Sequence, residues 1–110
     1  MKFEECYNMI KDVFESKDIS AIDTDFTGLI HFPGDDGGYI FGSYINGKKF
    51  IEPVKHDKAN ILVTLSVDTF EKIIKRELDP FKAFTSGKIK ASGNVFLALS
   101  LYKKIKAAGK

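Results

Sequence analysis

Apolar residues recur at helical spacing at the start of the chain. They are three or four positions apart, and the charged residues Lys2, Glu5, Asp12 and Glu15 take the opposite side. This period places the apolar side chains on one face of an amphipathic helix, which we expect to pack against the core. The residues of that face are Phe3, Cys6, Tyr7, Ile10, Val13 and Phe14.

The middle of the chain consists of short segments rich in aromatic and β-branched residues, a pattern typical of β-strands. Asn46-Gly47 separates two of them and supplies the two positive-φ positions of a type I′ hairpin turn. Pro53 has no N–H to donate, so its strand should lie at a sheet edge or end there. We expect strands at 24–32, 39–45, 48–54 and 61–67, with Phe26, Ile30 and Phe32 on one face of the first and an apolar, interior fourth strand.

Two short helices are expected after the fourth strand. Asp68 fits an N-cap that accepts from the backbone N–H of Glu71, and Glu71 can reach back as in a capping box. Asp79-Pro80 repeats the start signal, and Gly87 stands where a left-handed residue ends a helix. The buried stripe of the first of these helices should be Phe70, Ile73 and Ile74.

Residues 88–92 alternate as a fifth strand, Gly93 turns the chain, and Asn94 caps a last helix. The order α-β-β-β-β-α-α-β-α predicts an α+β fold, with a five-stranded mixed sheet covered by helices on one face. The length of 110 residues suits one domain, residues 1–110.

Charge and cysteine content say more about the partners and the compartment of the protein than about its chemistry. Seventeen basic and fifteen acidic residues leave a net charge of +2, which does not favour a strong polyanion partner. Cys6 is the single cysteine, so no intrachain disulfide forms, as in a reducing compartment. The N-terminus is too acidic for a signal peptide, and the apolar run 95–102 is too short to span a bilayer. We expect a cytoplasmic protein.

Residues 78–94 contain a phosphate-loop candidate, Gly87-Lys88. The loop would need a glycine at position 82, which holds Lys82, and Ser or Thr at position 89, which holds Ile89, so this interpretation is rejected. A nucleic-acid patch is also disfavoured, because apolar residues separate the lysines and solvent-facing lysines on an alternating strand are common.

No catalytic or metal-binding pattern is found. His31 and His56 have no ligand partner at useful spacing, and Asp35-Asp36 fits a turn. Cys6 should be a buried thiol. We therefore predict a protein that is not an enzyme and needs no cofactor.

Residues 78–101 instead carry the pattern L-x-P-x-x-A-F-x-x-G-K-x-K-x-x-G-N, followed by x-x-L-A-x-x-L. This pattern resembles the signature of the sterol carrier protein type-two family. The resemblance extends over nearly the whole chain, because a helix before a three-strand meander and a strand followed by a helix at 61–74 also fit. The matching residues are Leu78, Pro80, Ala83, Phe84, Gly87, Lys88, Lys90, Gly93, Asn94, Leu97, Ala98 and Leu101.

The resemblance implies strand order 3-2-1-4-5 and a lipid binding or transfer protein. Its helices would close over one sheet face and leave an apolar tunnel for a fatty acid, a fatty acyl-CoA or a sterol-like lipid. A transient membrane contact would follow from that role, and no nucleic-acid partner is implied. By position, the residues expected to line the tunnel are Phe70, Ile74, Phe81, Phe84, Ile89, Leu97 and Leu101.

A second interpretation stays open. The same fold could be an interaction module that serves a partner enzyme, or that forms a homodimer through its last helix, without a ligand of its own. For any single residue of the predicted tunnel, plain core packing is the simpler interpretation.

Overall fold

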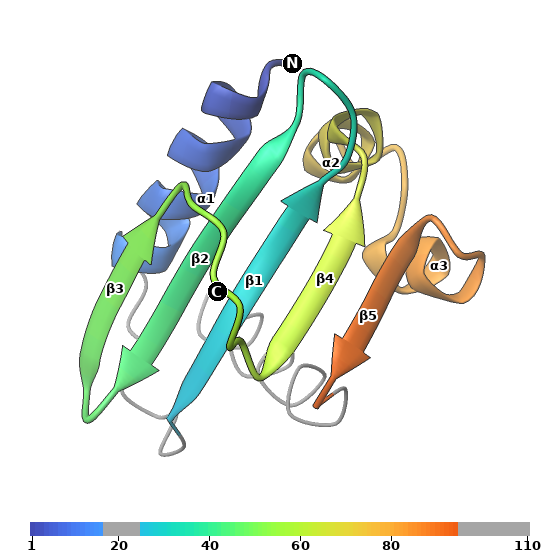
Figure 1. Ribbon diagram of the computed structural model, residues 1–110. Helices are drawn as coiled ribbons and strands as arrows, with labels where there is room; N and C mark the ends of the chain where they lie inside the picture. Colours follow the sequence, from blue (N-terminus) through green and yellow to red (C-terminus); the bar gives the residue numbers. More distant parts are fainter. Residues whose placement is uncertain (17–24, 95–110) are drawn as a thin grey trace.

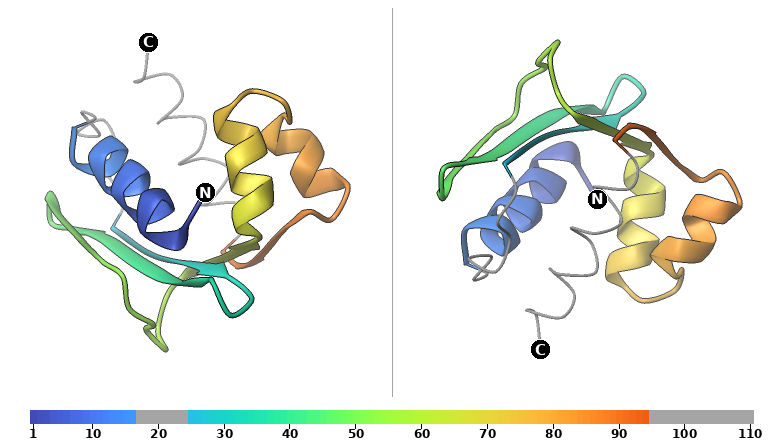
Figure 2. Two further views of the ribbon diagram at one scale, coloured as in Figure 1. Left: turned by 90° about the horizontal axis from the view of Figure 1, so that it is seen from above. Right: turned by 90° about the horizontal axis from the view of Figure 1, so that it is seen from below.

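The computed structural model describes residues 1–16 and 25–94. Five strands form one sheet in the order β3-β2-β1-β4-β5, and the helices lie against one side of it (Figure 1 and Figure 2). The fold class and the strand order are confirmed, whereas the predicted last helix lies outside the described residues. The elements are α1 (Phe3–Ser16), β1 (Phe26–Phe32), β2 (Gly38–Ile45), β3 (Lys48–Glu52), β4 (Ile61–Leu65), α2 (Val67–Ile74), α3 (Pro80–Thr85) and β5 (Ile89–Gly93).

The sheet is mixed, because β1 runs parallel to β4 and every other neighbouring pair is antiparallel. The hairpin between β2 and β3 has φ values of 52° at Asn46 and 78° at Gly47, which confirms the predicted type I′ geometry. Pro53 directly follows β3, an edge strand, so its missing N–H interrupts no pairing.

Helix α1 packs on the sheet through most of its predicted face. Cys6 is fully buried, and Phe3, Tyr7 and Ile10 pack against the core. Val13 departs from the prediction, because it lies at the margin of the apolar stripe and is nearly half exposed.

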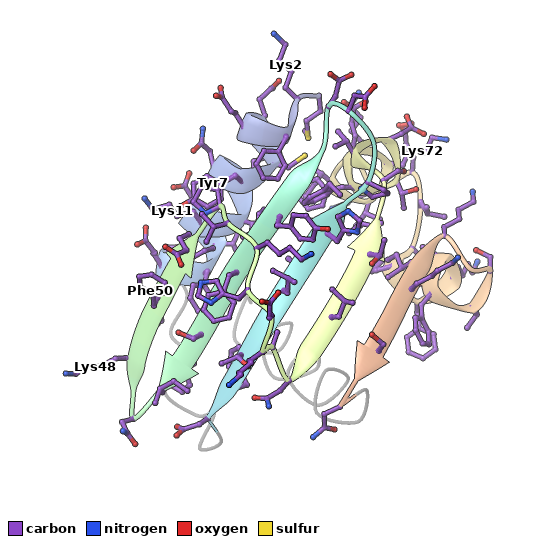
Figure 3. The ribbon with its side chains drawn as sticks, viewed as in Figure 1. Lys2, Tyr7, Lys11, Lys48, Phe50 and Lys72 are labelled. Carbon is purple, nitrogen blue, oxygen red and sulfur yellow. The ribbon has the colours of Figure 1, made fainter. Side chains whose placement is uncertain are left out.

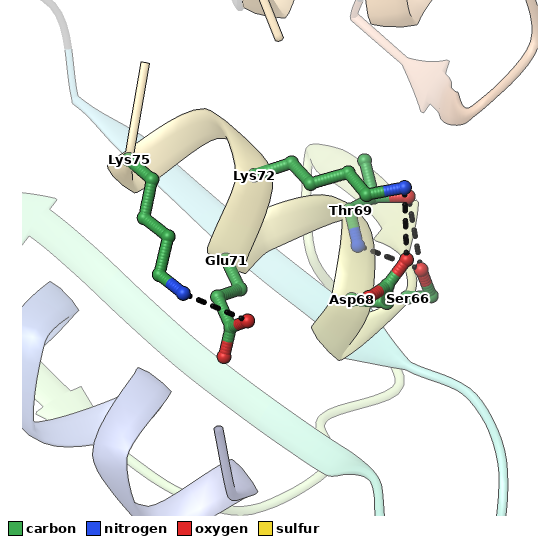
Figure 4. A network of polar contacts seen from close by, with 6 residues as sticks. All are labelled: Ser66, Asp68, Thr69, Glu71, Lys72 and Lys75. Carbon is green, nitrogen blue, oxygen red and sulfur yellow. Dashed lines mark hydrogen bonds and ion pairs between the residues drawn. The ribbon is translucent and has the colours of Figure 1, made fainter. Parts of the chain in front are cut away.

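Helix α2 begins two residues earlier than its sequence signal suggested (Figure 4). The N-cap is Ser66, whose hydroxyl accepts the backbone N–H of Thr69 at 3.0 Å, so the prediction of Asp68 as N-cap was wrong. Strand β4 ends at Leu65, and Ser66 is the first residue after it whose extended backbone and short hydroxyl suit a cap. Asp68 lies in the first turn instead and pairs with Lys72 at 3.4 Å.

Helices α2 and α3 both end in a left-handed residue with Schellman hydrogen bonds. In α3, Gly87 has φ of 85°, and the N–H of Lys88 donates to the carbonyl of Ala83 at 2.8 Å. In α2, the corresponding position is Arg76 with φ of 61°, and the next N–H donates to the carbonyl of Lys72 at 2.9 Å. The predicted Asp79 cap and Gly87 stop are thus confirmed.

The connection between β3 and β4 crosses the face of the sheet opposite the helices (Figure 1). His56 stacks on Phe41 with ring centroids 3.7 Å apart, and its Nε2 lies 2.6 Å from Glu52 Oε1. His31 stacks on Tyr39 across β1 and β2 at 4.4 Å. Both histidines therefore stack on aromatic rings of the sheet.

The core lies between the sheet and helices α1 and α2. The Phe32 ring makes edge contacts with Phe3 of α1 and Phe70 of α2, at centroid distances of 5.9 and 5.7 Å. Cys6, Ile40 and Leu65 complete the buried cluster. These contacts fix both helices over one end of the sheet, and this placement determines which part of the face the described residues leave uncovered.

Candidate functional site

The helix side of β1 and β2 is built from directly opposed residues. Residues two apart on a strand share a face, so the contacts of Phe32 with α1 and α2 identify this set as helix-facing. Along the two strands the facing pairs are Phe26–Tyr44, Gly28–Gly42, Ile30–Ile40 and Phe32–Gly38.

Gly28 and Gly42 leave the middle of this face without side chains. A Cβ atom at Gly28 would have no described atom within 4 Å, and one at Gly42 would meet only the Phe50 carbonyl at 3.8 Å. Gly38 behaves differently, because a Cβ there would come within 2.8 Å of the Phe3 ring. Phe3 therefore fills the space above Gly38, whereas no described residue fills the space above the Gly28–Gly42 pair.

Apolar residues surround the glycine pair on every neighbouring position. Phe26 and Tyr44 flank it on one side, with ring centroids 5.9 Å apart, and Ile30 and Ile40 flank it on the other. Ile61 of β4 pairs with Gly28, and Ile51 of β3 pairs with Gly42. The result is an apolar floor with a shallow central depression where the two glycines carry no side chains.

Within the described residues, a polar contact joins the residue at the start of the chain, ahead of α1, to α2. The Met1 amine lies 2.8 Å from Glu71 Oε1, and Lys75 Nζ lies 3.4 Å from the other carboxylate oxygen (Figure 4). The hydrogen bond from the amine, together with Lys75, lowers the pKa of the Glu71 carboxyl. The same hydrogen bond to Glu71 raises the pKa of the amine. Glu71 thus links the start of α1 to α2 instead of closing the predicted capping box.

The predicted tunnel residues separate into three groups. Phe70 and Ile89 pack partly buried against the core. Ile74, Phe81 and Phe84 are 41%, 52% and 36% exposed. The prediction that Ile74 is buried in the α2 stripe was therefore wrong. The stripe consists of Val67, Phe70 and Ile73. Leu97 and Leu101 lie outside the described residues. For all seven residues, the role of lining a tunnel stays a prediction.

Gly28 and Gly42 were missed as site residues by sequence reasoning. The alternation Phe26-x-Gly28-x-Ile30-x-Phe32 contained a signal, because a glycine in an apolar face of a strand leaves a gap in that face. The pairing of Gly28 with Gly42 depends on the register of β1 and β2, which the sequence does not show.

Metal binding, membrane spanning and thiol chemistry find no support in the part of the chain that is described. Within residues 1–16 and 25–94, no three His, Cys, Asp or Glu side chains come together as a metal site. No helix there is long and apolar enough to cross a membrane. Burial raises the pKa of the Cys6 thiol, which disfavours the reactive thiolate.

A helix-covered α+β sheet with an apolar floor defines a class of small domain suited to holding apolar molecules. The profile of the SCP-2 sterol transfer family matches residues 36–106. The chain belongs to the SCP-2 sterol transfer family.

Curated relatives are longer than this chain. Human hydroxysteroid dehydrogenase-like protein 2 is 33% identical over 103 residues, which cover 91% of the chain and 24% of that protein. The mouse protein of the same name is 31% identical over 101 residues and is covered to 20%. The chain therefore spans about a quarter or less of these relatives' length.

Solved structures share the fold at lower identity. The crystal structure of sterol carrier protein 2 like 2 from Aedes aegypti has a TM-score of 0.77 at 18% identity, with 91% of this chain and 93% of that chain covered. The solution structure of palmitated SCP2L2 from the same organism has a TM-score of 0.76 at 18% identity, covering 96% and 95%. The sec-alkylsulfatase Pisa1 from Pseudomonas sp. has a TM-score of 0.71 at 22% identity, covering 89% of this chain and 16% of that one.

Proposed function

We propose that this chain binds a single-chain lipid, a fatty acid or its coenzyme A thioester, between its helices and its sheet, and catalyses no reaction itself. The observation that carries the proposal is the Gly28–Gly42 pair, because it leaves space above the middle of an otherwise apolar sheet face. A flexible acyl chain can follow a shallow depression between neighbouring side chains.

The energy of an empty site supports a bound ligand. A site for one acyl chain needs at least about 300 Å³. At roughly 24 cal/mol per Å³, a dry void of that size would cost about 7 kcal/mol. Whole domains have only about 5–15 kcal/mol of stability, so such a space must collapse, admit water or hold a ligand. Each buried methylene contributes about 0.8 kcal/mol, which favours a long acyl chain.

Membership of a sterol transfer family supports lipid binding in general, and the palmitated mosquito protein supports a fatty acid in particular. A sterol is the competing ligand. Its rigid rings fit a depression only where walls and floor match their shape, whereas an acyl chain adapts by rotating about its single bonds.

A second candidate is an interaction module within a larger enzyme. It is favoured by one observation: matching segments make up 24% of human hydroxysteroid dehydrogenase-like protein 2 and 16% of the Pisa1 chain. In such a protein the domain could present a lipid substrate to a neighbouring catalytic domain, or only hold domains together. The two roles differ in whether the isolated chain binds a lipid.

Lipid extraction from the purified chain, followed by mass spectrometry, tests the proposal. We expect a near-stoichiometric fatty acid or acyl thioester in protein purified without detergent. A protein of similar size without a lipid site, purified in parallel, controls for carried-over lipid. Recovery of sterol in place of acyl lipid would revise the ligand class. If the chain contains no lipid and the delipidated protein binds none, the interaction module takes its place.

A further inference from the structure

Strand β3 is an edge of the sheet, and within residues 1–16 and 25–94 no strand pairs with its outer side (Figure 1). Its sequence is Lys48-Lys49-Phe50-Ile51-Glu52. Phe50 is 49% exposed, and Lys48 is exposed on the same strand (Figure 3). Charged residues and proline commonly protect such edges from pairing with other strands. Protection alone does not explain an exposed phenylalanine at the centre of the edge.

The hairpin between β2 and β3 fixes which backbone groups of β3 point outward. In a two-residue hairpin the residues that flank the turn, of which Lys48 is one, exchange both backbone hydrogen bonds, and this pattern alternates along the strands. Lys48, Phe50 and Glu52 are therefore bonded to β2. The N–H and C=O groups of Lys49 and Ile51 point away from β2, where a further strand would receive them.

The side chains of β3 complement a second copy of the same strand in antiparallel order. With Phe50 opposite Phe50 of the second copy, Lys48 lies opposite Glu52 in both directions. These three side chains share the face opposite the helices, since they alternate with Ile51, which packs against the core. The same register sets Lys49 opposite Ile51, so the outward N–H and C=O groups of one strand meet those of the other.

Both charged residues of this register are available. Lys48 has no ion pair with a described residue. His56 stacks on Phe41, and its Nε2 lies 2.6 Å from one carboxylate oxygen of Glu52, which holds this carboxylate in place. The other oxygen has no partner in the described part of the chain. Phe41 also supports Phe50, with ring centroids 6.4 Å apart. The edge thus presents an aromatic ring between a positive and a negative side chain.

We propose that two copies of this chain associate through their β3 edges and join the five strands of each into one continuous sheet. The Phe50 rings meet at the twofold axis, and a Lys48–Glu52 pair flanks them on each side. Opposed aromatic and oppositely charged side chains stabilise antiparallel strands, and they come closest at non-hydrogen-bonded positions such as these. The axis is perpendicular to the sheet, so the helices of both copies lie on the same side.

The opposite edge, β5, does not offer the same match. Pairing with a second β5 about Ala91 would set Lys90 opposite Ser92, and this strand contains no acidic residue. Pairing of β3 with β5 of another copy would leave one edge of each kind free and would continue into a chain of copies. Twofold pairing of β3 with β3 leaves no free β3 edge, so assembly stops at the dimer.

The paired segment is short. Pro53, directly after β3, has no N–H to donate, so pairing ends with the five residues of the strand. Interfaces that bury less than about 1,200 Å² are typical of weak, transient association. We therefore expect a monomer–dimer equilibrium that shifts with protein concentration.

Sedimentation velocity over a range of concentrations measures this equilibrium. Lys48→Glu should raise the dimer Kd at least about tenfold, because two attractive pairs become repulsive. Lys90→Glu makes the same chemical change at an exposed position of β5 and should leave the Kd unchanged. A parent chain that stays monomeric up to about 1 mM would overturn the proposal, as would equal effects of the two substitutions.

Charge exchange tests the register. Lys48→Glu alone and Glu52→Lys alone each oppose like charges across the axis, so each variant should dimerise poorly. In an equimolar mixture of the two, every charged pair between different variants is again opposite, and heterodimers should form with nearly the affinity of the parent chain. Circular dichroism verifies that each variant is folded. The absence of heterodimers from a mixture of folded variants would exclude this register.

Amide hydrogen exchange tests the edge in the parent chain, without any substitution. The amides of Lys49 and Ile51 should exchange rapidly in dilute protein and become protected as the concentration rises, because they gain partners in the dimer. Protection at all concentrations would show that the edge is covered within one copy. Concentration-dependent protection of β5, together with oligomers larger than a dimer, would show pairing of β3 with β5. Either result would overturn the proposal.

Discussion

At the scale of single residues, the two Schellman caps show that residues with different side chains can adopt the same backbone conformation. Gly87 and Arg76 both adopt positive φ, 85° and 61°, at the same position after their helices. Glycine adopts this conformation freely, but a residue with a Cβ does so at a cost of roughly 1–2 kcal/mol. Arg76 therefore carries strain that Gly87 does not.

Opposite effects are expected from substitution at these two positions. Gly87→Val should lower the free energy of unfolding by about 1–2 kcal/mol, and the cause is conformational, since no described atom lies within 4 Å of the new Cβ. Arg76→Gly should leave stability unchanged or raise it by up to about 1 kcal/mol. Urea unfolding midpoints at constant slope measure both. An unchanged midpoint for Gly87→Val would contradict a strained left-handed position at this cap.

The Cys6 thiol should respond to pH. Burial raises its pKa, so the folded protein keeps the proton at a pH where the unfolded chain loses it. Its contribution to stability is then full below the ordinary thiol pKa and is lost as pH rises through the folded pKa. The difference in free energy of unfolding between the parent and Cys6→Ala should stay constant up to about pH 8 and narrow above it.

Alkylation provides an independent measure, because Cys6 is the only cysteine. Iodoacetamide should label the native protein at least about 100-fold more slowly than the unfolded chain. Rapid labelling of the native protein would contradict the buried, protonated thiol.

At the scale of elements, strands β1 and β2 differ along their length in how α1 and α2 cover them. Phe3 fills the position above Gly38, but no described side chain occupies the position above Gly28. Both are glycines on the helix side of the same strand pair. Their different environments follow from where α1 begins and which way it crosses the sheet.

Filling the depression should block lipid without loss of stability. Gly28→Leu should bind less fatty acid than the parent chain, because the new side chain occupies the proposed site. Its unfolding midpoint should be unchanged or higher, since a strand interior favours a side chain over glycine by up to about 1 kcal/mol. Fluorescent fatty-acid titration and urea unfolding measure the two effects.

Ser43→Leu is the matched control, because Ser43 pairs with Phe50 of β3, lies on the opposite face of β2 from Gly42 and is half-buried. It should bind fatty acid like the parent chain. Full binding by Gly28→Leu would show that the lipid does not use the glycine pair.

At the scale of the whole molecule, lipid and fold are expected to stabilise each other. A ligand that binds only the folded state at about 100 times its Kd adds about 2.7 kcal/mol. For a domain of this size, that should raise the Tm of delipidated protein by roughly 10 °C or more. Scanning calorimetry with added palmitate measures the rise.

Leu101→Glu should abolish the rise in Tm, because it would place a charge in the wall of the predicted tunnel. Leu101→Met keeps the apolar character and should retain the rise. Equal shifts for the two variants would exclude Leu101 from the site.

The sequence alone determined the number, type and order of the described elements, and the resemblance supplied the order of the strands. Local signals sufficed for the turn at Asn46-Gly47, the edge at Pro53 and the Asp79 cap. Each acts within a few residues, through an allowed φ range or a missing or added hydrogen bond.

Tertiary structure decided which of several equivalent local signals was used. Ser66 and Asp68 are both good caps, and the end of β4 selected Ser66. Ile73 and Ile74 are chemically alike, yet only Ile73 meets the core. Gly28 and Gly38 are both glycines in strands, and Phe3 fills the space above Gly38 but not the space above Gly28. Burial and empty space depend on contacts between distant segments, which no local pattern contains.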